Sequence, residues 1–342
     1  MPEHLRRYVL RRCAWSLVTL LGITLLSFGL LRAAHADPLL ARMQDPQNAG
    51  RVSMRALEQL RTLYDLDQPW YVQYAKLLQR FATLDLGTRW QDGRPIRDVL
   101  AEALPITLTL TAAALALAYL LAIPIGVYAA AKRGRAFDHV VSSSSSLLFS
   151  LPAFWVGTLL LLFLASGQFV TCPQLPHAAC FPLQGWHSFA GFERMTPFER
   201  LRDLLWHGVL PVVTLAYPAF AVLSRHMRAA TLETLRLDYV RTARAKGLSG
   251  RTVLWRHVLR NSLLPMITLL GLELPQLVSG SVVVESVFGI RGMGLIALEA
   301  MRMPDYPMAI TVVTLTAVFT LFGSLLADIL HALLDPRLRV QP

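Results

Sequence analysis

Six apolar stretches, each of a length suited to crossing a lipid bilayer, constrain this chain more than any other feature. A hydrocarbon layer of about 30 Å is crossed by a helix of about 20 residues, and irregular backbone is not tolerated against lipid. We therefore predict an all-α integral membrane protein with six transmembrane helices. The fourth stretch is short and contains Pro211 and Pro218, so its ends are the least defined. The six predicted spans are Cys13–Leu31, Pro105–Ala131, Val140–Ala165, Val209–Leu223, Ser262–Val284 and Met308–Leu333.

Composition supports this fold class, because 54% of the residues are hydrophobic and 16% are charged, whereas about a quarter are charged in soluble domains. The predicted organisation has three parts. Residues 1–34 hold an N-terminal segment and the first span, and residues 35–103 form an outer segment with surface helices. Residues 104–342 form a five-helix core. The arginine-rich start also resembles a cleavable signal peptide, but its apolar run is long enough to span.

The helix expected at Pro69–Phe81 has aromatic and leucine side chains on one face and polar ones on the other. Such a helix lies on the membrane surface or the helical bundle. It could equally belong to the core of a small external subdomain. Both alternatives remain open from the sequence.

Charge predicts the orientation of the spans. If the N-terminus is cytoplasmic and the spans alternate, the lysine and arginine excess behind the net charge of +11 falls in the inner segments. Positively charged loops stay in the cytoplasm, so both termini are predicted to be cytoplasmic. The basic residues flank spans without interleaved aromatic side chains, which argues against nucleic-acid binding.

The sequence contains no motif for catalysis or cofactor binding. It lacks the G-x-x-x-x-G-K-[ST] phosphate loop, the H-E-x-x-H zinc motif and a nucleophile elbow. We therefore expect a transport protein that is not an enzyme, with no metal site and no cofactor bound by this chain.

Ionisable groups within spans usually face a cavity or another helix. Glu273 and Asp328 lie within predicted spans. Proton coupling would use such groups, and helix packing is the alternative. The candidates for lining a pathway or for packing between helices are Glu273, Pro275, Glu285 and Asp328.

Three cysteines are present. Cys13 in the first span is expected to be a small apolar residue. Cys172 and Cys180 lie eight residues apart in the second outer stretch, Ser166–His207, where a disulfide could persist. Free thiols are the alternative, and metal binding with nearby histidines fits no zinc spacing well.

The basic inner stretch Ser224–Asn261 contains the run D-Y-V-R-T-A-R-A-K-G-L from Asp238 to Leu248. Asp238 is suited to capping a short helix, and Gly247 is suited to ending it in a left-handed conformation. An interfacial helix held by anionic lipid would also be basic. The sequence alone does not separate this alternative from a protein contact.

This run resembles the cytoplasmic coupling motif of the permease subunits of oligopeptide and dipeptide ABC importers. The general motif is Glu-Ala-Ala, three residues, then Gly, and Arg241-Thr242-Ala243 and Gly247 stand at those positions. Arginine in place of glutamate is what the peptide subclass shows. The resemblance also covers the arginine-rich start, Asp37-Pro38, Tyr64–Pro69, Asp85–Thr88, Glu285–Phe288, Gly292–Gly294, Asp305–Pro307 and Asp335–Arg337.

The resemblance implies a type I ABC importer permease fold in a bacterial inner membrane. It implies an assembly of two homologous permeases, two ATP-binding cassette subunits that hold ATP and Mg, and an extracytoplasmic substrate-binding protein. A helix at 238–248 would press Ala243 and Gly247 into the ATPase. The residues implied in this contact are Asp238, Tyr239, Arg241, Thr242, Ala243, Arg244, Ala245, Lys246 and Gly247.

Peptides are the implied cargo. The exact substrate stays open between dipeptides, oligopeptides, nickel chelates and antimicrobial peptides. A proton-coupled secondary transporter acting alone is the alternative function.

Overall fold

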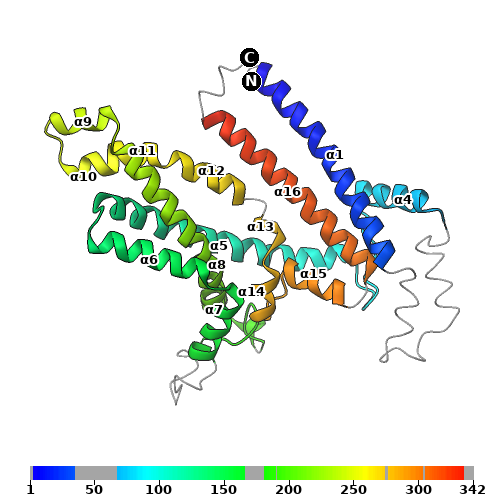
Figure 1. Ribbon diagram of the computed structural model, residues 1–342. Coiled ribbons are helices and arrows are strands. Elements are labelled where there is room, and N and C mark those ends of the chain that lie inside the picture. The colour runs from blue at the N-terminus through cyan, green and yellow to red at the C-terminus, as the bar shows by residue number, and fades with distance from the viewer. Residues whose placement is uncertain are drawn as a thin grey trace, which may run out of the picture. The chain divides into compact units, whose positions relative to one another are not determined.

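The computed structural model describes residues 3–34, 68–165, 181–189, 191–273, 276–302 and 305–334. These residues are almost entirely helical, and the described part contains no β-strand beyond a single bridge between Thr88 and Pro95. The chain divides into two compact units, and Figure 1 labels the helices and colours them by their place along the chain. Unit 1 comprises Met1–Leu104 and Ile296–Leu321, and unit 2 comprises Pro105–Leu295 and Phe322–Pro342.

The elements of the described residues are helices. In order they are α1 (Glu3–Ala34), α4 (Trp70–Thr83), α5 (Ile96–Ala131), α6 (Ala136–Ser150), α7 (Ala153–Leu160), the π-helix η1 (Leu161–Ala165), the 3-10 helix η2 (Phe192–Arg194), α8 (Pro197–Thr234), α9 (Asp238–Ala245), α10 (Gly250–Thr252), the π-helix η3 (Val253–Val258), α11 (Leu259–Ser262), α12 (Leu264–Glu273), α13 (Gln276–Ser279), α14 (Val282–Val287), α15 (Met293–Arg302) and α16 (Tyr306–Leu334).

Four of the predicted spans are confirmed as long apolar helices. Helices α1, α5, α8 and α16 each contain a stretch long and apolar enough to cross a membrane. The all-α membrane class is therefore confirmed. The prediction of six spans is not, because the described residues hold four such helices, or five if one bent pair counts as a span.

The third predicted span is broken rather than continuous. Helices α6 and α7 meet at an angle of 97°, and Leu151 between them has an extended ψ of 128°. Pro152 explains the break, because proline disfavours the helical conformation of the residue before it. The hydroxyl group of Tyr217 donates to the Leu151 carbonyl at 2.7 Å, which satisfies a group that the break releases from the helix.

The fifth predicted span is also not a single helix. Helix α12 is described over Leu264–Glu273, and residues 274–275 after it lie outside the described residues. Two short helices, α13 and α14, follow it, and Gly280 between them has a φ of +68° that L side chains rarely adopt. The prediction of one span over Ser262–Val284 is therefore wrong for the described residues. Pro275 itself lies outside them.

Helix α8 is much longer than the span predicted within it. It has 38 residues, about 57 Å, and begins with a capping box in which Thr196 and Glu199 bond reciprocally. The predicted span Val209–Leu223 forms its middle. Its last turn leads directly into α9, so α8 connects the membrane part of unit 2 to the basic segment.

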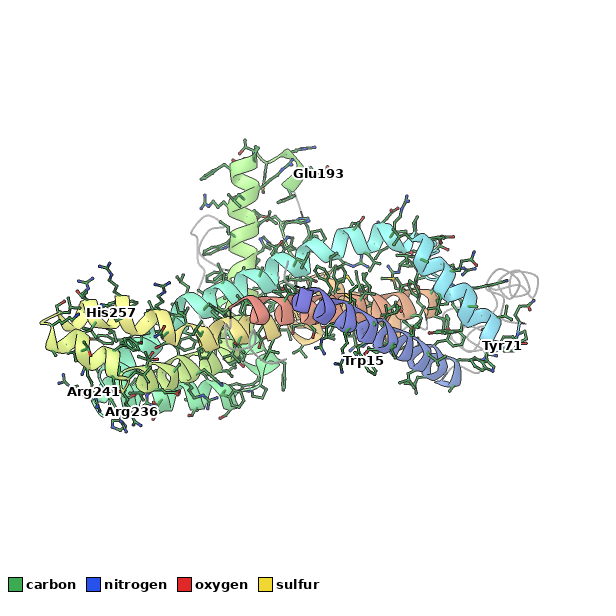
Figure 2. The ribbon with its side chains drawn as sticks, turned by 90° about the horizontal axis from the view of Figure 1, so that it is seen from above. Trp15, Tyr71, Glu193, Arg236, Arg241 and His257 are labelled. Atoms are coloured by element: carbon green, nitrogen blue, oxygen red, sulfur yellow. The ribbon has the colours of Figure 1, made fainter. Side chains whose placement is uncertain are left out.

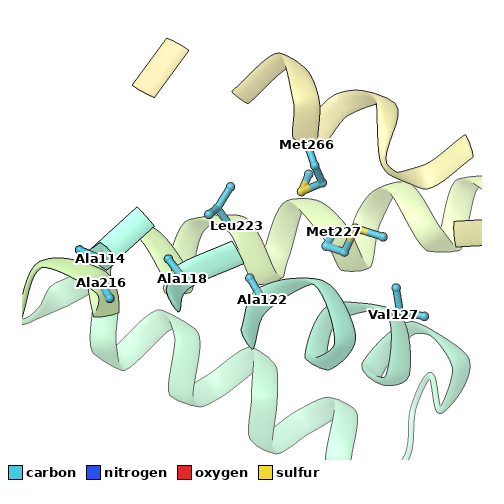
Figure 3. Close-up of a cluster of buried hydrophobic side chains, with 8 residues drawn as sticks. All are labelled: Ala114, Ala118, Ala122, Val127, Ala216, Leu223, Met227 and Met266. Atoms are coloured by element: carbon cyan, nitrogen blue, oxygen red, sulfur yellow. The ribbon is translucent and has the colours of Figure 1, made fainter. Parts of the chain in front are cut away.

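Small side chains hold α5 close to α8. Figure 3 shows Ala114, Ala118 and Ala122 along α5 in the same buried cluster as Met227 of α8. A Cβ at Gly126 would stand 2.8 Å from the Met227 Cβ. Helices in lipid associate through close backbone approach of this kind. Met266 of α12 completes the cluster, so the core of unit 2 joins three helices.

An ion pair fixes the start of α6 to α8. The Arg228 guanidinium donates to Asp138 through Nε at 2.5 Å and through Nη2 at 2.9 Å. The Gly134 N–H donates to the same carboxylate at 2.9 Å. Asp138 is buried, and a bidentate pair of this type fixes orientation as well as distance. The hydroxyls of Ser145 and Ser224 add a second polar contact between the two helices, at 3.0 Å.

Unit 1 confirms the helix predicted at Pro69–Phe81 as α4. Its Tyr74 hydroxyl lies 2.9 Å from Thr24 Oγ1 and 3.0 Å from the Leu21 carbonyl of α1. The Tyr74 ring packs against Phe28. Of the two alternatives left open above, packing on another helix of the chain is therefore the one observed.

The start of α16 in unit 1 is held by a buried carboxylate. Asp305 accepts hydrogen bonds from the N–H groups of Met308 and Trp90, at 3.2 and 3.0 Å, and Arg89 Nε lies 3.9 Å away. Burial raises the pKa of Asp305, although these three groups oppose the shift. The segment around Arg89 is thereby attached to the end of a spanning helix.

Other predicted features lie outside the described residues or side chains. Cys172 and Cys180 fall in a range that is not described, so their disulfide stays a prediction. Asp328 lies in α16, but its side chain is not among those described.

Candidate coupling surface and pathway residues

The predicted basic helix is confirmed as α9, but Asp238 does not cap it. Leu237 is the capping residue, with a ψ of 147° and no side-chain bond. Asp238 is instead the first helical residue, and its carboxylate lies 3.5 Å from Arg241, with both side chains largely exposed. The capping prediction is therefore wrong. An acid in the first turn still favours the helix through its dipole.

The other end of α9 is the left-handed stop that the sequence predicted. Gly247 has a φ of +81°. Its N–H donates to the Arg244 carbonyl at 2.9 Å, and the Leu248 N–H reaches back to the Ala243 carbonyl at 3.4 Å. These two bonds form a Schellman motif, which satisfies the last carbonyls of the helix. No neighbour lies within 4 Å of a Cβ at Gly247, so conformation alone demands glycine.

Ala243 faces inward, which corrects the prediction that it lies on an outer contact face with Gly247. Val240 and Ala243, one turn apart, are buried against Val253 and Val258. The reason is that the chain folds back after Gly247 and covers this face of α9 with its own π-helix η3. The remaining side chains of the predicted set are exposed: Asp238, Tyr239, Arg241, Thr242, Arg244, Ala245 and Lys246.

Side-chain bonds attach α9 to the following helices. The Tyr239 hydroxyl donates to the His257 carbonyl at 3.2 Å and accepts from the Asn261 amide at 2.7 Å. Ser262, at the end of α11, bonds the Thr234 hydroxyl at 3.1 Å, at the end of α8. With the buried valines, these contacts make the ends of α8 and α11 and the whole of α9 one packed body.

The exposed face of α9 is basic and includes one small residue. Arg241 and Ala245 are one turn apart, so they lie on the same face. We call Arg241, Thr242, Ala245 and Lys246 the outer face of α9. Figure 2 shows the side chains of Arg236, Arg241 and His257 at the end of unit 2 that α9 occupies. A rigid, positively charged helix with a small side chain at Ala245 suits contact with an acidic cleft.

Glu285, a predicted pathway or packing residue, is fully buried in unit 2. One carboxylate oxygen accepts from the Thr107 hydroxyl at 3.0 Å, and the other accepts from the Leu295 N–H at 2.8 Å. Thr107 in turn accepts from the Met293 N–H at 2.8 Å. Glu285 therefore packs α14 and the start of α15 against α5.

The glycines around Glu285 allow this close packing. A Cβ at Gly292 would lie 2.4 Å from Thr107 Oγ1 and 2.7 Å from the Glu285 carboxylate, and one at Gly280 would also meet both side chains. The sequence indicated a tight turn in this glycine-rich stretch. It did not indicate the carboxylate that the turn encloses.

Glu273, another predicted candidate, is half-buried in α12. It lies on the wall of a cavity of about 420 Å³ in unit 2. Glu285 is not on this wall, so the structure does not bring the two carboxylates to one site. In the described part of the chain, no group of three His, Cys, Asp or Glu residues could hold a metal ion.

Sequence reasoning missed three residues that the structure shows to be important for packing. Thr107 is one of three threonines, with Thr109 and Thr111, in an apolar run, and nothing in the sequence distinguished it from the other two. Asp138 and Arg228 lie ninety positions apart. In the sequence, each looks like an ordinary charged residue near the end of a span. Only the ion pair in the structure shows that the two residues hold helices together.

The chain is similar to known transport proteins. Residues 122–340 match the family model described as binding-protein-dependent transport system inner membrane component. The chain is 36% identical to the oligopeptide transport system permease protein AppB of Bacillus subtilis, over 97% of this chain and 98% of that one. It is 33% identical to the di/tripeptide permease DppB of Pseudomonas aeruginosa, over 98% and 99%. It is 30% identical to the dipeptide permease DppB of Escherichia coli K12, over 97% and 98%.

Proposed function

Since this chain belongs to the family of binding-protein-dependent transport system inner membrane components, we propose that it is a permease subunit of a peptide importer driven by ATP. The observation that carries the proposal is its similarity, over nearly its whole length, to permease proteins named for oligopeptide and dipeptide transport. As one permease it forms half of the translocation pathway.

In this proposal α9 is the coupling helix that an ATPase subunit grips from the cytoplasm. Its outer face supplies Arg241 and Lys246 for pairing with acids, and Ala245 allows close approach. ATP-driven closure of the partners must be passed on as a rigid-body shift. The packing of α9 onto η3 and the ends of α8 and α11 supports this role, because a flexible loop would absorb the movement.

The proposed partners are a second homologous permease, two ATP-binding cassette subunits and an extracytoplasmic substrate-binding protein. ATP and Mg belong to the cassette subunits, so this chain itself is not an enzyme. The proposed location is the bacterial inner membrane, with lipid around the apolar helices and both termini in the cytoplasm. The lysine and arginine excess in the predicted inner segments supports that orientation.

A proton-coupled transporter acting alone is not favoured. Its support was the pair of acids Glu273 and Asp328 in predicted spans. The relatives are permeases of transport systems, one of them named as an ABC transporter permease, and their names give no sign of proton coupling.

Uptake of a labelled dipeptide into proteoliposomes tests the proposed function. The vesicles contain this chain, its partner permease and the cassette subunits, with the binding protein outside. We expect uptake to require ATP hydrolysis in the lumen, to stop with a non-hydrolysable analogue and to persist when a protonophore removes the proton gradient. Uptake by this chain alone, driven by a pH gradient, would contradict the proposal.

A further inference from the structure

A cavity of about 420 Å³ lies within the helical core of unit 2. Its wall is formed by α5, α6, α8, α12 and α13, together with Gly280 and Ser281 before α14. Most of the lining is apolar, including Leu115, Phe149 and Leu269. Neither α9 nor Glu285 lines the cavity, although Gly280 on its wall packs against Glu285.

Glu273 is the one ionisable residue among those that line this cavity. None of the described residues forms an ion pair with it. The Thr111 hydroxyl, also on the wall, is already bonded to the Thr107 and Leu277 carbonyls, at 2.6 and 2.8 Å. Glu273 therefore lies on a mostly apolar wall on which the Thr111 hydroxyl is already in use.

An unpaired carboxylate among apolar side chains is costly unless a cation joins it. We infer that Glu273 binds the ammonium group of the cargo peptide while the apolar walls contact its aliphatic or aromatic side chains. This inference rests on the proposed function, because it takes a peptide as the cargo. The α-amino group and a lysine side chain offer the same chemistry.

Equilibrium binding to the permease and cassette assembly in nanodiscs, without the binding protein, tests this inference. The probes are radiolabelled dialanine, N-acetyl-dialanine and N-acetyl-lysyl-alanine. We expect dialanine to bind about tenfold or more tighter than its acetylated form, since removing a partner from a desolvated charge pair is costly. Binding of N-acetyl-lysyl-alanine would show that a side-chain ammonium also serves, and its failure would assign the site to the α-ammonium.

Variants test whether the Glu273 carboxylate is the group that binds the ammonium. Glu273→Gln should remove the preference for dialanine, Glu273→Asp should keep part of it, and Glu193→Gln, outside the cavity, should leave it intact. Equal binding of both dialanine probes to the native protein, or no measurable binding of either, would overturn the inference. So would separation of the two permeases on gel filtration of Glu273→Gln, because the carboxylate would then pair with the second subunit.

Failure of this inference can be distinguished from failure of the proposed function. If the native assembly shows no ATP-driven uptake, the proposed function fails. If it transports dialanine with ATP and Glu273→Gln transports it equally well, only the inference about Glu273 fails.

Discussion

Replacing Ala245 with tryptophan is expected to reduce ATP-driven peptide uptake strongly while the protein stays folded in the membrane. Ala245 is exposed on the outer face of α9, so the bulky ring meets no other part of this chain's described structure. In the assembly it would hold α9 away from the ATPase. We expect uptake to fall about tenfold or more, which corresponds to about 1.4 kcal/mol of lost contact free energy. Transport assays with Ala245→Ser as the matched control measure the effect.

Ala243 provides the contrast, because the same change there acts on this chain alone. Tryptophan at Ala243 would be forced among Val240, Val253 and Val258, and overpacking of a filled core typically costs about 1–3 kcal/mol. We expect a lower thermal stability and less protein in the membrane.

A lipid anchor would respond differently, since tryptophan is favoured at membrane interfaces. Normal uptake by Ala245→Trp, with uptake lost in Arg241→Gln and Arg244→Gln, would therefore favour the lipid alternative and contradict the coupling role of α9.

Replacing Glu285 with alanine is expected to be the most destabilising single change outside α9. The carboxylate accepts from Thr107 and from the Leu295 N–H in a fully buried site. Its loss leaves buried donors unsatisfied, at about 1–3 kcal/mol each, and also leaves a cavity. Glutamine should restore part of the stability, because its amide oxygen can still accept from Leu295.

Thermal unfolding in detergent, followed by tryptophan fluorescence, measures this effect, with the exposed Glu233→Ala as control. Thr107→Val removes the hydroxyl that links Glu285 to Met293. Its effect should not add to that of Glu285→Ala, because both changes break one network. A Glu285→Ala protein as stable as Glu233→Ala would refute the role assigned to this carboxylate.

Apolar length predicted the long helices well and the broken ones poorly. The first, second and sixth spans appear as α1, α5 and α16 because lipid-length apolar runs can only be helices. Pro152 was visible in the third span, but proline inside a helix bends it or breaks it depending on its neighbours. The neighbour here is Tyr217, which bonds the Leu151 carbonyl from a distant part of the sequence.

Helix α8 shows the opposite failure. The helix is longer than predicted because charged residues lie at both of its ends. A hydropathy pattern ends a span at charged residues, although a helix can continue through them. Packing against α5 and α6 keeps residues such as Arg228 helical well beyond the apolar stretch.

At α9, the sequence predicted what local backbone rules determine. Gly247 ends α9 because a left-handed residue is needed there. The direction of Ala243 depended on Val253 and Val258, which reach it only after the chain reverses. A motif can thus identify a helix without showing which of its faces meets a partner.

A cysteine at Ala245 tests the central claim most directly. In a chain whose three native cysteines are replaced, an impermeant thiol reagent added to intact cells should not label Ala245→Cys but should label Gln91→Cys in the predicted outer segment. In inverted membranes that contain the whole assembly, a short thiol cross-linker should join Ala245→Cys to a cassette subunit. Labelling from outside, or the absence of any cross-link in an assembly active in uptake, would contradict the account.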